Sequence, residues 1–128
     1  MKLALLTSVA LLVAVTVVFG KTGVANSPAV VETRCGWFSN PTPANASLFD
    51  RDAEWIIGVQ GGHQAEGDWP AFGPKQWVET NVHYGYGCAC LQVQVDHEQH
   101  QVLKIEKASA RELSVCRRDR ALKRWEFK

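Results

Sequence analysis

The feature that most constrains the fold is the stretch of residues 84–95, which reads Tyr-Gly-Tyr-Gly-Cys-Ala-Cys-Leu-Gln-Val-Gln-Val. From position 89 onward, apolar and polar residues alternate, which is the period of a half-buried β-strand. The same period puts Cys88 and Cys90 together on the glutamine face of this strand. A second layer of chain must therefore cover that face, and cysteines elsewhere in the chain are the expected means of holding it there. The apolar face carries Ala89, Leu91, Val93 and Val95.

The N-terminus has the form of a secretory signal peptide. An early positive charge at Lys2 precedes the uncharged apolar run 3–19, and small residues suited to cleavage follow it. We expect cleavage after Ala25, with Gly20 as the alternative. A retained membrane anchor is the competing interpretation, although the run lies at the short edge of spanning length. The sequence therefore predicts an exported protein, with residues 1–25 removed and no integral membrane segment in the mature chain.

Four cysteines in an exported chain of this length indicate two disulfides. A link between Cys88 and Cys90 is the poorest of the pairings, because the Cβ vectors of two same-face residues of one strand run parallel. Each of these two is therefore expected to reach out, one to Cys35 and one to Cys116. Which cysteine goes to which partner stays open. Each bridge is worth about 3–4 kcal/mol in the chain-entropy model.

Charge is distributed unevenly along the mature chain. Residues 26–116 carry six Lys or Arg against eleven Asp or Glu, whereas residues 117–128 carry six basic residues against two acidic ones. A nucleic-acid binder would carry positive charge on its folded face, so we expect no nucleic-acid partner. The basic C-terminal tail, 117–128, is expected to be a solvated end. Contact with an anionic membrane surface or a partner is the alternative.

The remaining patterns predict a single, mainly β domain: a small antiparallel meander of about five strands, stapled by disulfides, with room for one short helix. Residues 26–34 are expected to be a flexible leader, and 35–116 the β-rich domain. Residues 40–45 should form an extended loop, since they contain two prolines. Inward side chains are expected at Trp55, Ile57, Val59, Leu103 and Ile105, with Val102 as a further candidate. Strands are expected over residues 54–60, 76–80, 89–95 and 101–107, and over 108–116 leading into Cys116.

The long loop 61–75 is the candidate binding site. It mixes acidic residues with two aromatic ones, and long loops on a rigid β scaffold suit recognition of a protein or a glycan. The alternative is that the aromatic residues fold under the loop as a satellite core. The candidate ligand-binding residues are His63, Glu66, Asp68, Trp69 and Phe72.

Three chemical alternatives are weaker. A zinc site built from His83 with Cys88 and Cys90 lacks the usual spacing of paired cysteines. A redox role for the same two cysteines lacks a neighbouring charge that would activate a thiol. Hydrolysis of a glycan needs two carboxylates, but the available pairs lie beside predicted loops. We therefore expect no catalytic residue, no metal and no cofactor. The carboxylate pairs are Asp52 with Glu54 and Glu66 with Asp68.

Several motifs together carry a resemblance to a known family. They are Cys35-Gly36-Trp37-Phe38, the segment 40–45, Gln60-Gly61-Gly62, the run 84–91 and Cys116-Arg117-Arg118-Asp119. The chain resembles a family of small exported bacterial proteins catalogued as a domain of unknown function. At residues 81–84 it departs from a more glycine-like turn in that family.

The resemblance implies a periplasmic or secreted protein and brings no activity. We therefore expect an exported binding protein without catalysis, such as an inhibitor, an immunity-type protein or an envelope accessory factor. Its partner would be an envelope protein or a glycan. The alternatives are a peptidoglycan-acting enzyme and a thiol-redox or metal-binding protein.

Overall fold

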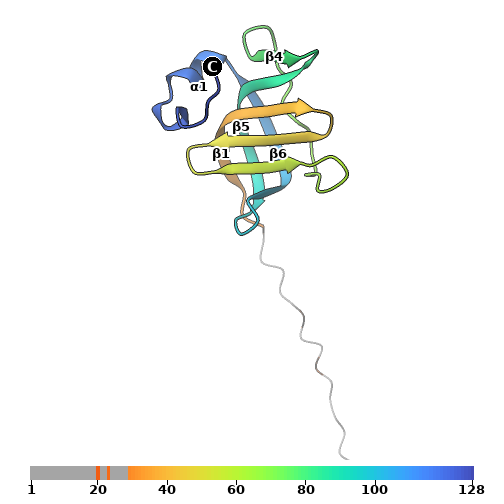
Figure 1. The fold of residues 1–128 in the computed structure, drawn as a ribbon. Coiled ribbons are helices and arrows are strands. Elements are labelled where there is room, and N and C mark those ends of the chain that lie inside the picture. Colours follow the sequence, from red (N-terminus) through yellow and green to blue (C-terminus); the bar gives the residue numbers. More distant parts are fainter. Residues whose placement is uncertain (1–19, 21–22, 24–28) are drawn as a thin grey trace, which may run out of the picture.

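The computed structural model describes residues 20, 23 and 29–128. The predicted signal peptide therefore lies almost wholly outside the described residues. The described part is mainly β, with one short α-helix (Figure 1). It also has two disulfides, so the predicted fold class is confirmed. Its elements are β1 (Glu32–Thr42), β2 (Asn45–Asp50), β3 (Glu54–Gly58), β4 (Trp77–Asn81), β5 (Tyr84–Asp96), β6 (Gln101–Arg111), α1 (Leu113–Arg118) and the 3₁₀ helix η1 (Arg120–Leu122).

The strands form one sheet that curls into a barrel. Its order is β1-β2-β3-β6-β5-β4, and β1 also pairs with β5, so five strands close a ring. Strand β4 pairs with residues 84–87 of β5, before the segment 88–96 that pairs with β6. The closure between β3 and β6 is parallel and narrow, with one register pair, Ile56 opposite Gln101. Residues 63–66 fill the remaining gap, because Ala65 N donates to Ile57 O and Ile105 N donates to Glu66 O, both at 2.8 Å. This five-stranded barrel has the architecture of OB-folds.

The segment with two prolines forms the turn of the antiparallel β1–β2 hairpin. Residues 40–45, expected to be an extended loop, instead end β1 and begin β2. Pro43 and Ala44 form the two-residue turn, with Ala44 at φ 59°. Pro41 lies at a register irregularity, one of the few places where a strand accepts proline. Strand β2 was absent from the expectations, because buried Asp50 interrupts its apolar alternation.

The barrel interior is the main core. Alternation along β5 places Ala89, Leu91 and Val93 inside, as predicted. Two register irregularities between β5 and β6 shift the pattern of β6, so that Leu103, expected inside, is 45% exposed. Val59, also expected inside, lies beyond the end of β3 and is exposed. The buried core residues are Phe38, Ala46, Leu48, Trp55, Ile57, Ala89, Leu91, Val93, Val102 and Ile105.

Both disulfides start on the outer face of β5. Cys90 bonds to Cys35 on the neighbouring strand β1, and Cys88 bonds to Cys116 in α1. The predicted use of the cysteines is thus confirmed, and the pairing that the sequence left open is settled. Residues 113–116 form a helix and not the expected continuation of a strand.

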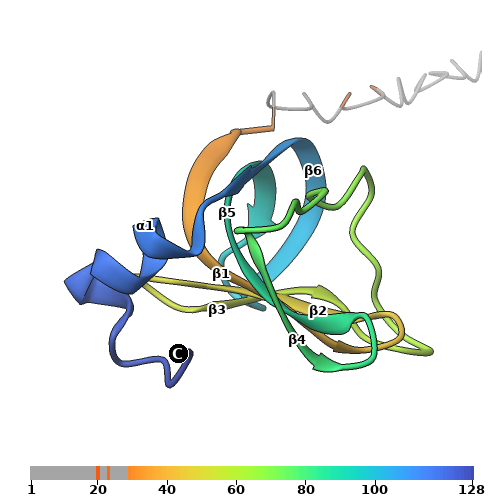
Figure 2. The ribbon, with the colours of Figure 1, turned by 90° about the horizontal axis from the view of Figure 1, so that it is seen from above.

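The two chain ends of the described domain are more ordered than expected. Glu32 to Arg34, expected in a flexible leader, belong to β1 and pair with β5. The basic segment 117–128, expected to be a solvated end, folds back over the outside of the barrel (Figure 2). Leu122 is 3% exposed there, and Trp125 and Phe127 pack in a second cluster with Trp37. Apolar residues within the basic segment thus decide its position. No helix in the described part is long and apolar enough to cross a membrane.

Candidate functional site

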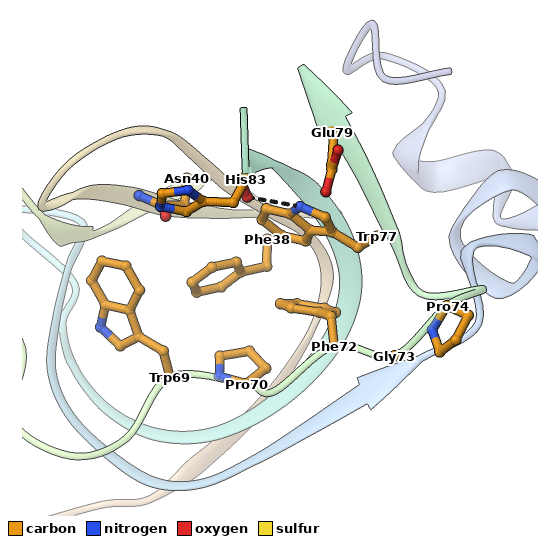
Figure 3. Close-up of a pocket in the computed structure, with 10 residues that line it drawn as sticks. All are labelled: Phe38, Asn40, Trp69, Pro70, Phe72, Gly73, Pro74, Trp77, Glu79 and His83. Carbon is orange, nitrogen blue, oxygen red and sulfur yellow. Dashed lines mark hydrogen bonds between the residues drawn. The ribbon is translucent and has the colours of Figure 1, made fainter. Parts of the chain in front are cut away.

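A cavity of about 590 Å³ opens beside the first residues of β5 (Figure 3). Its walls are mostly aromatic and proline side chains from three separate parts of the chain: β1, the loop before β4, and β4 with its hairpin. We call it the aromatic cavity. It is lined by Phe38, Asn40, Trp69, Pro70, Phe72, Gly73, Pro74, Trp77, Glu79 and His83.

The aromatic rings support one another. The Phe38 ring centroid lies 5.6 Å from that of Trp69 and 5.6 Å from that of Phe72. Phe72 in turn lies 4.8 Å from Trp77, whose Nε1 donates to the His83 carbonyl at 3.1 Å. Trp69, Phe72 and Trp77 are only partly buried. Flat apolar faces at such a cavity are typical of a ligand site.

Gly87 in β5 leaves room for Phe72 at the aromatic cavity. Tyr86 and Cys88 face the outer cluster, so Gly87 between them faces the cavity side. A Cβ at Gly87 would lie 2.5 Å from Phe72 Cε1 and 2.4 Å from the Gln76 carbonyl oxygen. Only glycine therefore lets the loop lie this close to β5.

Polar groups sit at the rim of the aromatic cavity. The Asn40 amide nitrogen donates to the carbonyls of Thr42 and Asn45, which leaves its side-chain oxygen as an acceptor. Glu79 and His83 are exposed. A few polar groups around an apolar floor are what fixes the orientation of a bound ligand.

The β4–β5 hairpin beside the aromatic cavity carries backbone strain. Its two-residue turn is Val82–His83, and Val82 has φ 56° and is 79% exposed. A β-branched residue rarely adopts this conformation, which glycine normally supplies in such turns. Residues held in such strained backbone conformations cluster at functional sites.

The five predicted ligand-binding residues are not gathered in one place. Trp69 and Phe72 line the aromatic cavity, whereas His63, Glu66 and Asp68 do not. His63 Nε2 instead bonds the Val102 carbonyl at 2.7 Å and fastens the start of the loop to β6. The backbone of Glu66 bonds β6 while its side chain points to solvent, and Asp68 is exposed.

Other cavity residues escaped the sequence analysis. Phe38 and Asn40 lie in β1, far along the chain from Trp77, Glu79 and His83. Local patterns suggest His83 only as a zinc ligand, and the others only as residues of a strand or a loop. Only a signal joining distant segments could have grouped them, and the alternation of Trp77 and Glu79 in a short strand was the one local hint.

A second polar cluster lies near the other end of β5. Arg34 stacks 3.8 Å above the Trp55 ring and bonds Asp50 at 2.7 Å and Glu32 at 2.5 Å. Burial favours a raised pKa for Asp50, but hydrogen bonds from Ala53 N, Arg34 and Asp52 N outweigh it and hold the pKa below its ordinary 3.8. The charged groups pair with one another, although Arg34 Nε and Trp55 Nε1 are buried without a hydrogen-bond partner. The buried ion pair between Arg34 and Asp50 indicates a structural role.

The alternative chemistries find little support in the geometry. In the described part of the chain, no group of three or more His, Cys, Asp or Glu side chains converges as a metal site would require. All four cysteines are in disulfides. Asp52 bonds Arg34 at 3.2 Å, and of the carboxylates only Glu79 lines the aromatic cavity.

Comparison with known proteins identifies the family. The family model described as "Protein of unknown function (DUF4087)" matches residues 29–123, so the chain belongs to this family. No curated protein and no solved structure gave a significant match. The family covers β1 to η1 and so includes every residue that lines the aromatic cavity.

Proposed function

Starting from its membership of a family of unknown function, we propose that this chain is an exported binding protein that holds a saccharide unit of an envelope glycan in the aromatic cavity, without covalent catalysis. The observation that carries the proposal is the convergence of Phe38, Trp69, Phe72 and Trp77 around one cavity with polar groups at its rim. The proposed periplasmic or secreted location is supported by the signal-like N-terminus and is compatible with two disulfides.

A saccharide fits these walls for two reasons. The apolar faces of pyranose rings stack on flat aromatic side chains, and Trp69 and Trp77 offer such faces partly open to solvent. Sugar hydroxyls need both donors and acceptors, which Asn40, Glu79 and His83 supply at the rim. The barrel architecture adds an analogy, since OB-folds bind oligosaccharides as well as oligonucleotides.

The absence of catalysis is part of the proposal. Glycoside hydrolysis uses two carboxylates that flank the scissile bond. Glu79 is the single carboxylate among the residues that line the aromatic cavity, whereas Glu54, Glu66 and Asp68 lie elsewhere. A turnover assay on peptidoglycan, with Glu79→Gln as the variant, would contradict this part of the proposal if the wild type released products and the variant did not.

Titration with soluble peptidoglycan glycan fragments, followed by calorimetry, tests the binding. We expect Trp77→Ala to lower the affinity at least about tenfold, because a stacked aromatic anchor is typically worth more than 1.4 kcal/mol. Leu103→Ala is the matched control, since it truncates an exposed side chain on β6 that does not line the cavity. Absence of binding to every fragment, or equal losses in both variants, would overturn the glycan assignment.

The second candidate is inhibition of an envelope protein. It is favoured by the exposed Val82 tip and by β4, which pairs with β5 alone and so leaves one edge for an added strand. Capture of a single envelope enzyme, lost in Val82→Asp and unaffected by glycan fragments, would favour this candidate over the first.

A further inference from the structure

A second surface, on the face of β5 that carries Tyr86 and Cys88, is strongly basic. It belongs to residues 113–128, which we call the C-terminal lobe and which comprise α1, η1 and the residues that follow. Only Asp119 and Glu126 are acidic within residues 117–128. Six basic side chains are all exposed there: Arg117, Arg118, Arg120, Lys123, Arg124 and Lys128.

The C-terminal lobe is anchored to the barrel. The Cys88–Cys116 disulfide joins it to β5, and Leu122 is buried. Trp125 Nε1 donates to the Asp50 carbonyl at 2.7 Å, and Tyr86 Oη donates to the Lys128 carbonyl at 2.5 Å. The positive charges therefore sit on a fixed surface, and bringing them to a partner costs little ordering entropy.

Three of these cations converge on one recess. Arg117, Lys123 and Lys128 line a hollow of about 760 Å³ together with Trp125 and Phe127. Glu126 also lines it and offsets part of the charge. Within the described residues, none of the six basic side chains forms an ion pair with a carboxylate. Arg117 donates a hydrogen bond to the Lys128 carbonyl oxygen at 3.3 Å, but in the part of the chain that the structure describes its charge and those of the other five are not paired with an Asp or Glu side chain.

The type of cation indicates the type of anion. Four of the six are arginines, whose guanidinium forks match the oxygens of phosphate groups. Tryptophan beside cationic side chains is also typical of surfaces that lie at a lipid headgroup layer. Residues 26–116 carry an excess of acidic groups, so an anionic surface would repel the barrel and attract only the C-terminal lobe.

We propose that the C-terminal lobe docks the protein on an anionic phospholipid surface, with a phosphate-bearing headgroup in the recess between Arg117, Lys123 and Lys128. This inference is independent of the glycan proposal, because it uses none of the residues that line the aromatic cavity. Docking through the C-terminal lobe would hold the whole protein at the membrane while the barrel faces away from it.

Co-sedimentation of the oxidised protein with vesicles tests the proposal. We expect binding to phosphatidylcholine vesicles that contain phosphatidylglycerol, weakening as salt rises, and none to pure phosphatidylcholine. Each basic residue near such a surface contributes about fivefold in affinity. Arg117→Glu with Lys123→Glu, a change of four charges, should therefore weaken binding at least about a hundredfold.

Control variants distinguish an effect of the C-terminal lobe from an effect of net charge or of misfolding. Lys104→Glu with Lys107→Glu makes the same change of charge on β6 and should leave the affinity within about threefold. If Arg117→Glu with Lys123→Glu does not fold, the neutral variant Arg117→Gln with Lys123→Gln is the test. Its affinity for the anionic vesicles should fall about 25-fold. Trp77→Ala should leave vesicle binding unchanged.

Three outcomes would overturn the inference. They are equal binding to neutral and anionic vesicles, an equal loss in the β6 control, and retention of full affinity by the glutamine variant. Tighter binding to soluble polyphosphate or to double-stranded DNA than to vesicles would also overturn it, because the C-terminal lobe would then recognise a soluble polyanion.

Discussion

The two ends of β5 use aromatic residues for opposite purposes. Near its last residues, Trp55 is buried beneath Arg34, and Arg34 is held by Asp50 and Glu32. Near its first residues, Phe72 and Trp77 stay partly open around the aromatic cavity (Figure 3). We call these the closed end and the open end.

The difference lies in what the neighbouring polar groups do. At the closed end, Arg34 donates to the carboxylates of Glu32, Asp50 and Asp52. Asp50 also accepts hydrogen bonds from two backbone amides. At the open end, Glu79 and His83 remain exposed, and Val82 keeps a strained conformation. Changes at the closed end should therefore cost stability, whereas changes at the open end should mainly alter what the surface can bind.

The largest expected effect comes from breaking the ion pair at the closed end. Arg34→Met leaves the Asp50 carboxylate, 4% exposed, without its cation. We expect the free energy of unfolding to fall by about 3–5 kcal/mol, because an unpaired buried charge is strongly destabilising. Urea unfolding followed by tryptophan fluorescence measures the change.

The control for this variant is Asp52→Ala, which removes the exposed partner of Arg34. Its cost should be at most about 1 kcal/mol. Similar losses of stability in Arg34→Met and Asp52→Ala would contradict the larger role assigned to the buried Asp50 carboxylate.

A smaller loss is expected from filling space at the open end. Gly87→Ala drives a Cβ against Phe72 and the Gln76 carbonyl. We expect a cost of about 1–3 kcal/mol from overpacking, together with a displaced Phe72 and weaker glycan binding. Thermal unfolding and the calorimetric titration measure the two effects.

Gly62→Ala is the matched control, because the nearest atom to its added Cβ is an ordinary van der Waals contact at 3.7 Å. It should leave both stability and affinity nearly unchanged. Full tolerance of Gly87→Ala would contradict the close fit of the loop on β5.

The third prediction is a gain in stability. Val82→Gly relieves the positive φ at the hairpin tip, and the relief outweighs the extra freedom of glycine in the unfolded chain. We expect a gain of about 0.5–1 kcal/mol in the free energy of unfolding, measured by urea denaturation.

Val82→Ala is the control, since it removes most of the exposed side chain but keeps the strained conformation; it should show no gain. If Val82→Gly destabilises the protein, the strain assigned to the open end is absent.

The smallest effect is the response of the closed end to acid. The pKa of Asp50 in the folded protein lies below the ordinary 3.8. Its contribution to stability is therefore fully present above pH 3.8 and is lost as the pH falls through the lower folded-state pKa. Urea unfolding as a function of pH should show this loss in the wild type and a flatter profile in Asp50→Asn. Equal slopes below pH 3.8 would contradict it.

Local patterns predicted much of the sheet and two of the four aromatic residues that line the aromatic cavity. Alternation located β5 with its inward Leu91 and outward Cys88. Loop composition drew attention to Trp69 and Phe72, which do line the aromatic cavity. Alternation failed where neighbouring strands slip, as at Leu103, and where a charged residue takes a core position, as at Asp50. In both cases the partner strand sets the position, and a single-strand period cannot report it.

The sequence by itself determined that this chain builds a disulfide-linked, mainly β domain, because a two-residue period and the faces of cysteines are properties of one strand. Only the tertiary structure decided that Cys90 joins Cys35, that the basic segment packs through Leu122 and Trp125, and that Phe38 meets Trp77 at one cavity. These outcomes depend on which distant segments become neighbours. That choice is made by closing the barrel and burying apolar surface over the whole chain.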